Sequence, residues 1–332
     1  MGTATGIGEY VRGLSFALRR IGVDIEELQE PRIDPWRFDR RVLWDQFLLP
    51  LRARTSHAAL LHCASGTMPL MCSLPIVVTV HDVAWLKVQA HAPAHSRWYF
   101  GKFSLRRYRH AQNIVVDSQF SRSELLGLLD VDAHKVSVVY PGVSADFLHT
   151  VRSSTANGTI LVVGTVESRK NLAVLIRALP YVPGARIVSV GPSTPYQSEC
   201  EELALRLGVR DRVVFRGYVS RDELLHCYAT CQIAAVPSRY EGFGYAAAQA
   251  LCAGVPLLVA NTSSLPEITR GDATIVASQS ADDWALALSR ALKAETKDAE
   301  SERALRQRAA ARFSWTASAR AMRDVFLRSV EA

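Results

Sequence analysis

The sequence predicts an α/β fold with two doubly wound, Rossmann-like domains, and three observations carry this prediction. Apolar stretches typical of buried strands alternate with amphipathic stretches typical of helices along the chain. The alternation is interrupted by the small, polar segment VRSSTANG at residues 151–158, which is typical of a linker. The length of 332 residues suits two domains of ordinary size better than one.

Composition indicates a folded protein and leaves two kinds of anionic partner open. Hydrophobic residues make up 48% of the chain and charged residues 21%, which favours a packed core over disorder. The net charge of +7 is spread over both halves, with 17 Lys and Arg against 14 Asp and Glu in residues 1–150. This spread does not indicate a nucleic-acid-binding arm. It suits anionic substrates and a negatively charged membrane surface equally well.

Cysteine usage and hydropathy lead us to expect a cytoplasmic protein. The six cysteines include no CxxC pair, and several lie in apolar or helical stretches, which is typical of buried free thiols in a reducing compartment. We find no signal peptide and no apolar run of about 18 residues, so we expect no transmembrane span. Peripheral contact with the inner face of the membrane stays open.

The chain opens with a glycine loop at residues 2–8, which leads directly into an amphipathic helix that ends at Gly22. A glycine loop before a helix normally follows a strand, because that strand aims the loop at a ligand. We therefore expect the first strand of this domain to be missing, and a form extended upstream to be more stable. The melting temperature and solubility of the two forms test this expectation.

The remainder of the first half alternates strands and a helix. His81 follows a β-branched strand, and side chains at the carboxyl end of a parallel strand face the ligand crevice, so His81 is expected to contact a ligand. A plain surface histidine is the alternative. Asp130 and Asp132 are predicted to be turn residues rather than metal ligands. Strands are predicted at residues 23–28, 59–62, 76–80, 113–118 and 135–140, and a helix within residues 34–54.

Residues 97–112 combine aromatic and basic side chains. This mixture suits a helix at a membrane interface or a site for an anionic acceptor. An ordinary helix with an apolar inner face and a solvated outer face explains it as well. We favour the ordinary helix, because Gly101 interrupts the pattern and the aromatic residues are too clustered for a clean stripe.

The second half repeats the alternation of strands and helices. Strands are predicted at residues 159–166, 185–190, 213–216, 232–236 and 257–260, and helices at 171–179, 196–207, 223–229 and 243–253. After Phe313, Ser314 and Trp315, a last helix is predicted to reach about residue 329.

Residues 238–268 are the stretch most indicative of a ligand site. Glu241 and Gly242 follow a strand at the mouth of a small-residue helix, and Gly254 ends that helix. Glycine lets the backbone approach a ligand, and a helix N-terminus supplies free N–H donors and positive potential. The pattern suits a polyhydroxylated, phosphorylated ligand, and an ordinary turn between a strand and a helix fits it about equally well.

A second cluster follows the strand at residues 159–166. Arg169 and Lys170 stand at a helix start just beyond Gly164, where a planar fork of donors and a point charge could together clamp a diphosphate. No nucleophile–base pair is visible, since the sequence has no GxSxG, no HExxH and no catalytic cysteine signature. This favours chemistry that relies on charge stabilisation and positioning.

These stretches resemble the donor-binding signature of glycosyltransferase family 4, the retaining GT-B sugar transferases. The family pattern PS-x-x-EGFG, with later G-x-P and LPE, is matched at Pro237, Ser238, Glu241, Gly242, Phe243, Gly244, Gly254, Pro256, Leu265, Pro266 and Glu267. The pattern GT-x-E-x-RKN is matched at Gly164, Thr165, Glu167, Arg169, Lys170 and Asn171. One position departs from the pattern, because Gln249 stands where relatives carry a second glutamate.

The resemblance implies a GT-B fold, with two doubly wound domains that face a cleft. The acceptor-side domain would span residues 1–151 and the nucleotide-sugar domain residues 159–311, with residues 312–332 as a helix that crosses back to the first domain. The implied catalytic residues are Glu241, Arg169, Lys170 and His81. The implied donor-binding residues are Gly8, Gly164, Gly217, Val219, Gly242, Phe243, Gly244 and Gln249.

The resemblance also implies a role for each group. Arg169 and Lys170 would stabilise the departing diphosphate, and the loop of Gly8 would complete that pocket. Glu241 and the N–H groups near Phe243 would hold sugar hydroxyls, His81 would approach the sugar, and the loop of Gly217 and Val219 would face the base.

Gln249 is where the resemblance is weakest. A glutamate accepts two hydrogen bonds from the ribose hydroxyls, whereas glutamine has one acceptor oxygen and no charge. Loss of one charge-assisted bond costs about 1–3 kcal/mol. Either the enzyme tolerates weaker donor binding, or the donor differs; a deoxyribose nucleotide would need less at this position.

The implied function is transfer of a mannose- or rhamnose-class hexose from a nucleotide sugar to a glycan or polyprenyl-linked glycan. The reaction would proceed with retention and without a metal or other cofactor, as in bacterial enzymes of surface polysaccharide and lipopolysaccharide synthesis. No nucleic-acid partner is expected. Two alternatives stay open: an inactive, binding-only relative, and a nucleotide-sugar epimerase on the same fold.

Overall fold

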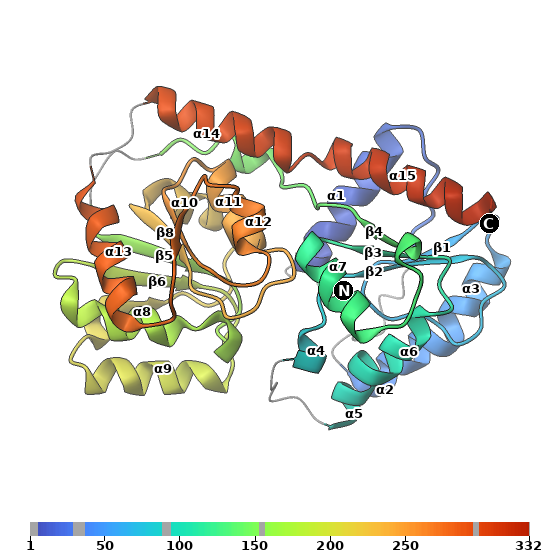
Figure 1. Cartoon of the computed structure of the whole chain (residues 1–332), viewed down its shortest axis with the longest axis horizontal. Coiled ribbons are helices and arrows are strands. Elements are labelled where there is room, and N and C mark those ends of the chain that lie inside the picture. Colours follow the sequence, from blue (N-terminus) through green and yellow to red (C-terminus); the bar gives the residue numbers. More distant parts are fainter. Residues whose placement is uncertain (1–5, 29–36, 88–93, 153–156, 295–298, 332) are drawn as a thin grey trace. The chain divides into compact units, whose positions relative to one another are not determined.

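The computed structural model describes residues 6–28, 37–87, 94–152, 157–294 and 299–331. Contacts divide the chain into two compact units: residues 1–142 with 314–332 form unit 1, and residues 143–313 form unit 2. Each unit contains a parallel β-sheet with helices packed around it (Figure 1). The predicted class, two parallel-sheet α/β domains, is therefore confirmed. Residues 153–156 of the predicted linker lie outside the described residues.

The sheet of unit 1 has four parallel strands in the order β1-β2-β3-β4. The strands are β1 (Leu61–Cys63), β2 (Ile76–Val80), β3 (Asn113–Val116) and β4 (Val136–Val138). The central strands β2 and β3 are buried at every position, as expected of strands that are covered on both faces. The helical elements are α1 (Gly6–Arg20), α2 (Phe38–Leu43), η1 (Trp44–Leu48), α3 (Leu49–Thr55), α4 (Ala84–Lys87), α5 (Ala94–Arg97), η2 (Trp98–Phe103), α6 (Ser104–Tyr108), α7 (Gln119–Leu128), η3 (Ala133–Lys135) and α15 (Trp315–Glu331).

Three local predictions for unit 1 can be compared with the structure. The strand predicted at residues 23–28 is wrong: this segment joins no sheet, and a salt bridge of 2.9 Å between Arg19 and Glu27 holds it against α1. Gly101 does not interrupt its helix but lies buried within the π-helical segment η2. The turn at Asp132 is confirmed, because its carboxylate accepts the N–H of His134 at 2.9 Å.

The core of unit 1 joins the first and last helices of the described chain. Tyr10 and Leu14 of α1 share a buried cluster with Met322 and Phe326 of α15. Trp315 fits where glycines leave room: a β-carbon at Gly13 would lie 2.2 Å from the Trp315 ring, and one at Gly142 would lie 2.4 Å from it. The end of the sequence therefore completes the unit that the beginning starts.

The sheet of unit 2 has six parallel strands in the order β10-β9-β8-β5-β6-β7. The strands are β5 (Thr159–Val163), β6 (Arg186–Val190), β7 (Val213–Phe215), β8 (Ile233–Val236), β9 (Leu257–Ala260) and β10 (Thr274–Val276). The helical elements are η4 (Ala145–Phe147), η5 (Ser168–Lys170), α8 (Leu172–Ala178), η6 (Leu179–Tyr181), α9 (Pro195–Arg206), η7 (Arg210–Arg212), α10 (Arg221–Thr230), α11 (Tyr245–Cys252), α12 (Leu265–Thr269), α13 (Ala281–Lys293) and α14 (Ala299–Arg312). In the sheet, the strands after β5 continue to one side as β6 and β7 and to the other side as β8, β9 and β10. The strand order therefore reverses between β5 and β8, which makes that pair the topological switch point of a doubly wound sheet.

Two helices of unit 2 begin where their caps place them rather than where the apolar pattern begins. Ser220 and Glu223 form a reciprocal capping box, so α10 begins at Arg221, two residues before the predicted start. Gly244 has φ of 95°, outside the helical region, so α11 begins at Tyr245 rather than at the predicted residue 243.

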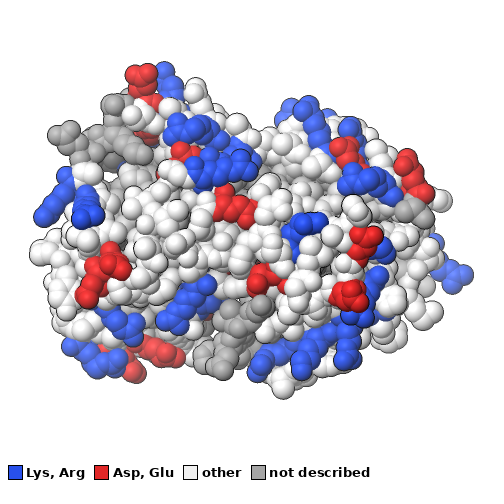
Figure 2. Space-filling view, in the orientation of Figure 1, with Lys and Arg blue, Asp and Glu red and all other residues white. Residues whose placement is uncertain are grey.

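Surface charge and helix hydropathy add two observations. Figure 2 shows that Lys and Arg gather at the lower edge of unit 1, in the region of α2, α5 and α6. No helix in the described part of the chain combines the length and the apolar character that crossing a membrane requires.

Candidate functional site

The topology of unit 2 brings the two predicted clusters together. Strands β5 and β8 are neighbours in the sheet, and the segments that follow them begin at Gly164 and Pro237. Ligands of doubly wound sheets bind outside the carboxyl ends of the strands at the switch point. The two glycine-containing segments therefore meet where such a sheet binds its ligand.

A salt bridge between Lys170 and Glu241 lies at the centre of this site. The Nζ of Lys170 lies 2.7 Å from Oε1 and 2.9 Å from Oε2 of Glu241. Ser238 adds a third contact, since its hydroxyl donates to Glu241 Oε1 at 2.7 Å. An ammonium group has three N–H donors, so Lys170 can contact Glu241 and still donate to a ligand.

The Glu241 carboxylate is buried and charged. Only 5% of the residue is exposed. Burial opposes ionisation, but Lys170 and then Arg169 outweigh it, and together with hydrogen bonds they hold the pKa of Glu241 below its ordinary value. The carboxylate is therefore an acceptor at neutral pH, as contact with sugar hydroxyls requires.

Arg169 ties the two segments to each other. Its Nε lies 2.8 Å from the Glu167 carboxylate, and its Nη1 donates to the Tyr240 carbonyl at 3.2 Å. Its own carbonyl accepts the N–H of Arg239 at 2.7 Å. Asn171, with a left-handed φ of 54°, donates to the Pro237 carbonyl at 3.3 Å. Side chains from the first segment thus position the backbone of the second.

The start of α11 offers backbone donors beside Glu241. Within the described part of the chain, the N–H groups of Phe243 and Gly244 have no hydrogen-bond partner. The Phe243 ring packs inward, 5.9 Å from that of Phe313, so this residue presents its backbone rather than its ring. Free N–H groups at a helix N-terminus bind oxygen-rich or anionic groups.

Two serines that support this loop were missed in the sequence analysis. The hydroxyl of Ser263 accepts the N–H of Glu241 at 2.9 Å, and Ser264 Oγ lies 3.0 Å from the carbonyl oxygens of both Glu241 and Phe243. The run Thr262-Ser263-Ser264 ahead of α12 was the available signal. Its partners lie about twenty residues away, so local pattern could not assign them.

Gln249 is buried in the second turn of α11. Its Oε1 accepts the hydroxyl proton of Tyr228 at 3.2 Å, and 7% of the residue is exposed. Tyr228 takes at most one of the two acceptor sites of the amide oxygen, so Gln249 can offer a ligand its Nε2 donor and a remaining acceptor site on Oε1. A glutamate at this position would have no such donor.

The loop of Gly217 and Val219 follows β7, at the same edge of the sheet. Gly217 has φ of 65°, and its carbonyl accepts the N–H of Gly191 at 2.8 Å. Gly191 in turn follows β6, and the N–H of Gly164 donates to Val190 at 2.8 Å. Hydrogen bonds therefore connect the turns after β5, β6 and β7.

His81 and Gly8, the other predicted site residues, lie in unit 1. His81 Nδ1 lies 2.7 Å from Asp117 Oδ2, and Nε2 lies 3.0 Å from the Ala64 carbonyl. Burial opposes the charge of His81, but Asp117 outweighs it and raises the pKa of the imidazole. In this arrangement both ring nitrogens are engaged by the protein. Asp117, which directly follows the neighbouring parallel strand β3, was not identified as its partner from the sequence.

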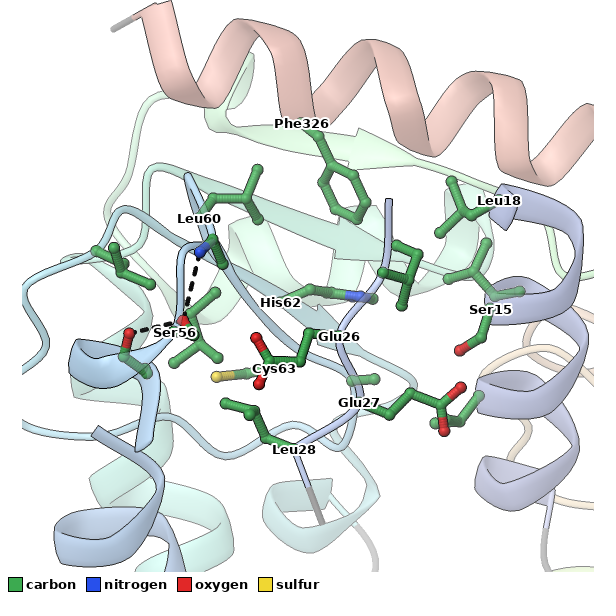
Figure 3. Close-up of a pocket in the computed structure, with 18 of the residues that line it drawn as sticks. Ser15, Leu18, Glu26, Glu27, Leu28, Ser56, Leu60, His62, Cys63 and Phe326 are labelled. Carbon is green, nitrogen blue, oxygen red and sulfur yellow. Dashed lines mark hydrogen bonds between the residues drawn. The ribbon is translucent and has the colours of Figure 1, made fainter. Parts of the chain in front are cut away.

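Unit 1 also contains a cavity of about 1130 Å³ beside β1. Its walls come from α1, residues 22–28, β1 and α15, and Figure 3 shows Leu28, Leu60, His62 and Phe326 around it. Gly8 lines this cavity, whereas His81 does not.

Comparisons with known proteins agree with this geometry. Residues 150–312 match the family model described as glycosyl transferases group 1, and residues 5–147 match the model described as glycosyltransferase family 4. Over 281 residues the chain is 30% identical to the D-inositol 3-phosphate glycosyltransferase of Xylanimonas cellulosilytica, which covers 78% of this chain and 67% of that protein. The chain belongs to glycosyltransferase family 4.

Two further relatives are each matched over part of their length. An uncharacterized glycosyltransferase of Methanocaldococcus jannaschii is 27% identical over 64% of this chain and 58% of its own length. The D-inositol 3-phosphate glycosyltransferase of Mycobacteroides abscessus is 28% identical over 77% of this chain and 61% of its own length. The chain thus spans about six-tenths of the length of these curated relatives.

Solved structures show the GT-B fold expected of the family. Anabaena HepE in complex with UDP and glucose aligns with a TM-score of 0.74 at 16% identity, over 98% of this chain and 97% of that one. Sucrose-phosphate synthase from Thermosynechococcus elongatus aligns with a TM-score of 0.75 at 21% identity, over 97% and 93%. At these identities the likeness supports the fold alone.

Proposed function

We propose that the chain is a retaining glycosyltransferase that transfers a hexose from a nucleotide sugar to a glycan or lipid-linked glycan. The observation that carries this proposal is the ionised Glu241 paired with Lys170 at the switch point, beside the free N–H groups of Phe243 and Gly244. A carboxylate suits sugar hydroxyls, and a cation and N–H donors suit a diphosphate.

The residues of unit 2 can stabilise the charge that develops when the donor breaks. Cleavage of the bond between sugar and diphosphate leaves negative charge on the diphosphate. Arg169 and Lys170 would hold that charge in a partly buried site, where electrostatic stabilisation exceeds that in water. The leaving diphosphate would take the proton of the acceptor hydroxyl as the new bond forms on the same face of the sugar. This route needs no protein nucleophile and no metal or other cofactor.

The donor is the part of the proposal that needs the most direct test. A hexose of the mannose or rhamnose class is proposed from the pattern of His81-Asp82, residues 169–171 and residues 313–315. HepE is described with UDP and UDP-glucose, which supports a nucleotide-sugar donor for this chain as well. The Nε2 group of Gln249, which a glutamate lacks, would contact the sugar ring of the nucleotide and help to distinguish ribose from deoxyribose. A deoxyribose nucleotide sugar therefore stays among the proposed donors.

The acceptor and the place of action complete the proposal. A polyprenyl-linked glycan at the inner face of the membrane fits the basic surface of unit 1, and a cytoplasmic protein with peripheral contact would reach it. WaaG, a glycosyltransferase described as involved in lipopolysaccharide biosynthesis, shares this fold, which supports a role in the synthesis of a surface glycan.

A thermal-shift panel of GDP, UDP and dTDP sugars identifies the donor, and nucleoside diphosphate release then measures turnover with EDTA present. We expect one donor to stabilise the protein and release to persist in EDTA. We expect release to disappear in Glu241→Gln, and NMR of the product to show retained anomeric configuration. Stabilisation without any release would indicate a binding-only relative, and an epimerised donor without release would indicate an epimerase; either result overturns the proposal.

A further inference from the structure

One side of unit 1 exposes a line of large apolar side chains. Helices α2, η1 and α3 run continuously from residue 38 to residue 55. Leu43, Phe47 and Leu51 recur at every fourth residue of this run and are 48%, 65% and 60% exposed. These three residues are called the apolar stripe. On the same helices Leu49 and Ala53 are buried, so the stripe is not the face that packs on the unit.

A loop adds two more exposed apolar side chains beside the stripe. Leu70 and Met71 are 51% and 83% exposed. Their loop is fixed rather than loose: Gln46 accepts the N–H of Leu70 at 2.8 Å and donates to the Met68 carbonyl at 3.2 Å. Arg107 of α6 donates to the Leu70 carbonyl at 2.6 Å. The loop tip is therefore held between η1 and α6 with its side chains outward.

A second line of exposed residues, on η2, α6 and the residue that follows α6, consists of three basic side chains and a tryptophan. Trp98, Lys102, Arg106 and Arg109 recur at helical spacing and are all exposed. Residues 94–110 carry five Lys and Arg and no Asp or Glu. These four residues are called the basic stripe. The hydroxyl of Tyr99, next to Trp98, accepts a hydrogen bond from Gln46 at 2.9 Å, so η2 packs against η1.

We propose that this face of unit 1, formed by the apolar stripe, the loop tip and the basic stripe, docks on a membrane surface that contains anionic lipids. Apolar side chains beside lysine and arginine are the chemistry of interfacial binding, in which the apolar groups enter the headgroup boundary and the cations meet lipid phosphates. Figure 2 shows the basic side chains gathered on this part of unit 1.

The charge of this face argues against a second copy of the chain as the occupant. A symmetric contact would bring two basic stripes together, and like charges repel. A soluble polyanion would engage the basic stripe but would leave Phe47, Leu51 and Met71 in water. The lipid surface uses both parts of the face. The inference deepens the proposed function, since a lipid-linked acceptor lies at such a surface.

Vesicle co-sedimentation of the full chain tests the proposal. The vesicles contain phosphatidylcholine alone or phosphatidylcholine with phosphatidylglycerol. We expect binding to the anionic vesicles that weakens as salt is raised. At about 1 kcal/mol for each basic residue near the surface, Lys102→Glu with Arg106→Glu should weaken this binding at least about ten-fold. Phe47→Ser with Met71→Ser leaves the net charge unchanged and should weaken binding to a similar extent, because the apolar side chains that enter the headgroup boundary are removed.

Matched controls separate docking from general charge and from misfolding. Arg320→Glu with Arg328→Glu reverses two exposed arginines of α15, which lies across the unit 1 sheet from α2 and α6 in Figure 1. Leu205→Ser makes the same kind of neutral change at an exposed leucine of unit 2. Both controls should bind vesicles like the unaltered chain, and every variant should keep its melting temperature.

Two outcomes would overturn the proposal. The first is equal binding of the unaltered chain and the face variants. The second is a loss of binding only with the charge reversals and not with Phe47→Ser and Met71→Ser, which would describe adsorption to an anionic surface by charge alone. Binding is measured without nucleotide sugar, so a failure here is distinct from a failure of the proposed transferase activity.

Discussion

At the scale of single residues, the site depends on charges that are balanced inside the protein. Glu241 is buried, and Lys170, of which 19% of the side chain is exposed, is its nearest cation. Taking either charge out of water is costly, and each offsets the cost for the other. The salt bridge therefore keeps an ionised carboxylate and an ammonium group together at the switch point of unit 2, where a ligand can contact them.

We expect a double-mutant cycle on this pair to show strong coupling. Lys170→Met leaves Glu241 buried without its main partner and should destabilise unit 2 by about 3 kcal/mol. Glu241→Gln should cost about 1–3 kcal/mol, and the double variant should cost much less than the sum. Denaturant unfolding of the full chain measures these values. Simple additivity would contradict the assigned pairing, and donor binding should stay lost in the double variant.

Two histidines of unit 1, His62 and His81, should give its stability a maximum near the ordinary histidine pKa of about 6.5. Burial and then the nearby His81 lower the pKa of His62 to about 4, so the unfolded chain takes up this proton first and stability falls as pH drops from 6.5 towards 4. The pKa of His81 is raised, so its contribution is complete below 6.5 and is lost as pH rises through its folded-state pKa.

Melting temperatures of the full chain between pH 5 and pH 8.5, the range of roughly one to two units around the histidine pKa, measure this profile. His81→Gln combined with Asp117→Asn replaces the pair by neutral groups and should flatten the alkaline side, whereas the burial of His62, the larger cause of its lowered pKa, keeps most of the acid side. An alkaline slope that survives in this double variant would contradict the role assigned to His81.

At the scale of elements, the turns after β5 and β6 need glycine because two backbones meet there. Gly191 has φ of 147°, and a β-carbon on it would lie 2.1 Å from the Gly164 carbonyl oxygen. Gly164 leads into the segment that carries Arg169 and Lys170, so this close approach helps to set the position of the cationic part of the site.

Gly191→Ala should therefore destabilise unit 2 by about 3 kcal/mol or more, from the clash and the backbone strain together. Gly208→Ala is the matched control. It too has a positive φ, of 67°, but nothing lies within 4 Å of its added β-carbon, so about 1 kcal/mol is expected. Calorimetry measures both; equal costs would show that the contact with Gly164 does not matter.

At the scale of the whole molecule, helix α15 packs in unit 1, although residues 143–313 of unit 2 separate it in sequence from the rest of that unit. Helix α15 supplies Ala319, Met322, Val325 and Phe326 to the core that α1 and β2 begin. Unit 1 therefore completes its core only when the last helix is in place.

We expect Met322→Ala, at a fully buried position, to destabilise unit 1 by about 2–5 kcal/mol. Leu327→Ala, on the same helix but 54% exposed, should change stability by about 0.5 kcal/mol or less. A calorimetric scan resolves the effect, because the transition of unit 1 should move while that of unit 2 stays. Equal effects of the two variants would contradict the assigned packing of α15.

Local sequence pattern predicted the bounds of an element correctly where a run of β-branched or apolar residues gave a clear signal. The β-branched run at residues 76–80 became β2 at the predicted bounds, and the strand at 257–260 became β9. The pattern failed where contacts between distant segments determine whether a strand forms. Residues 23–28 have strand-like composition, but in the described structure they pair with no sheet. Periodicity also did not predict the π-helical segments η1 and η2, which lie within stretches predicted as ordinary helix.

The sequence by itself determined the α/β class and the candidate residues Glu241, Arg169 and Lys170, because strand and helix periods and short motifs are local properties. Only the tertiary structure decided that Lys170 pairs with Glu241 across 71 residues, that Ser263 and Ser264 hold the Glu241 loop, and that His81 pairs with Asp117. Such contacts follow from strand order and register, which arise when distant segments pack together and which no local pattern contains.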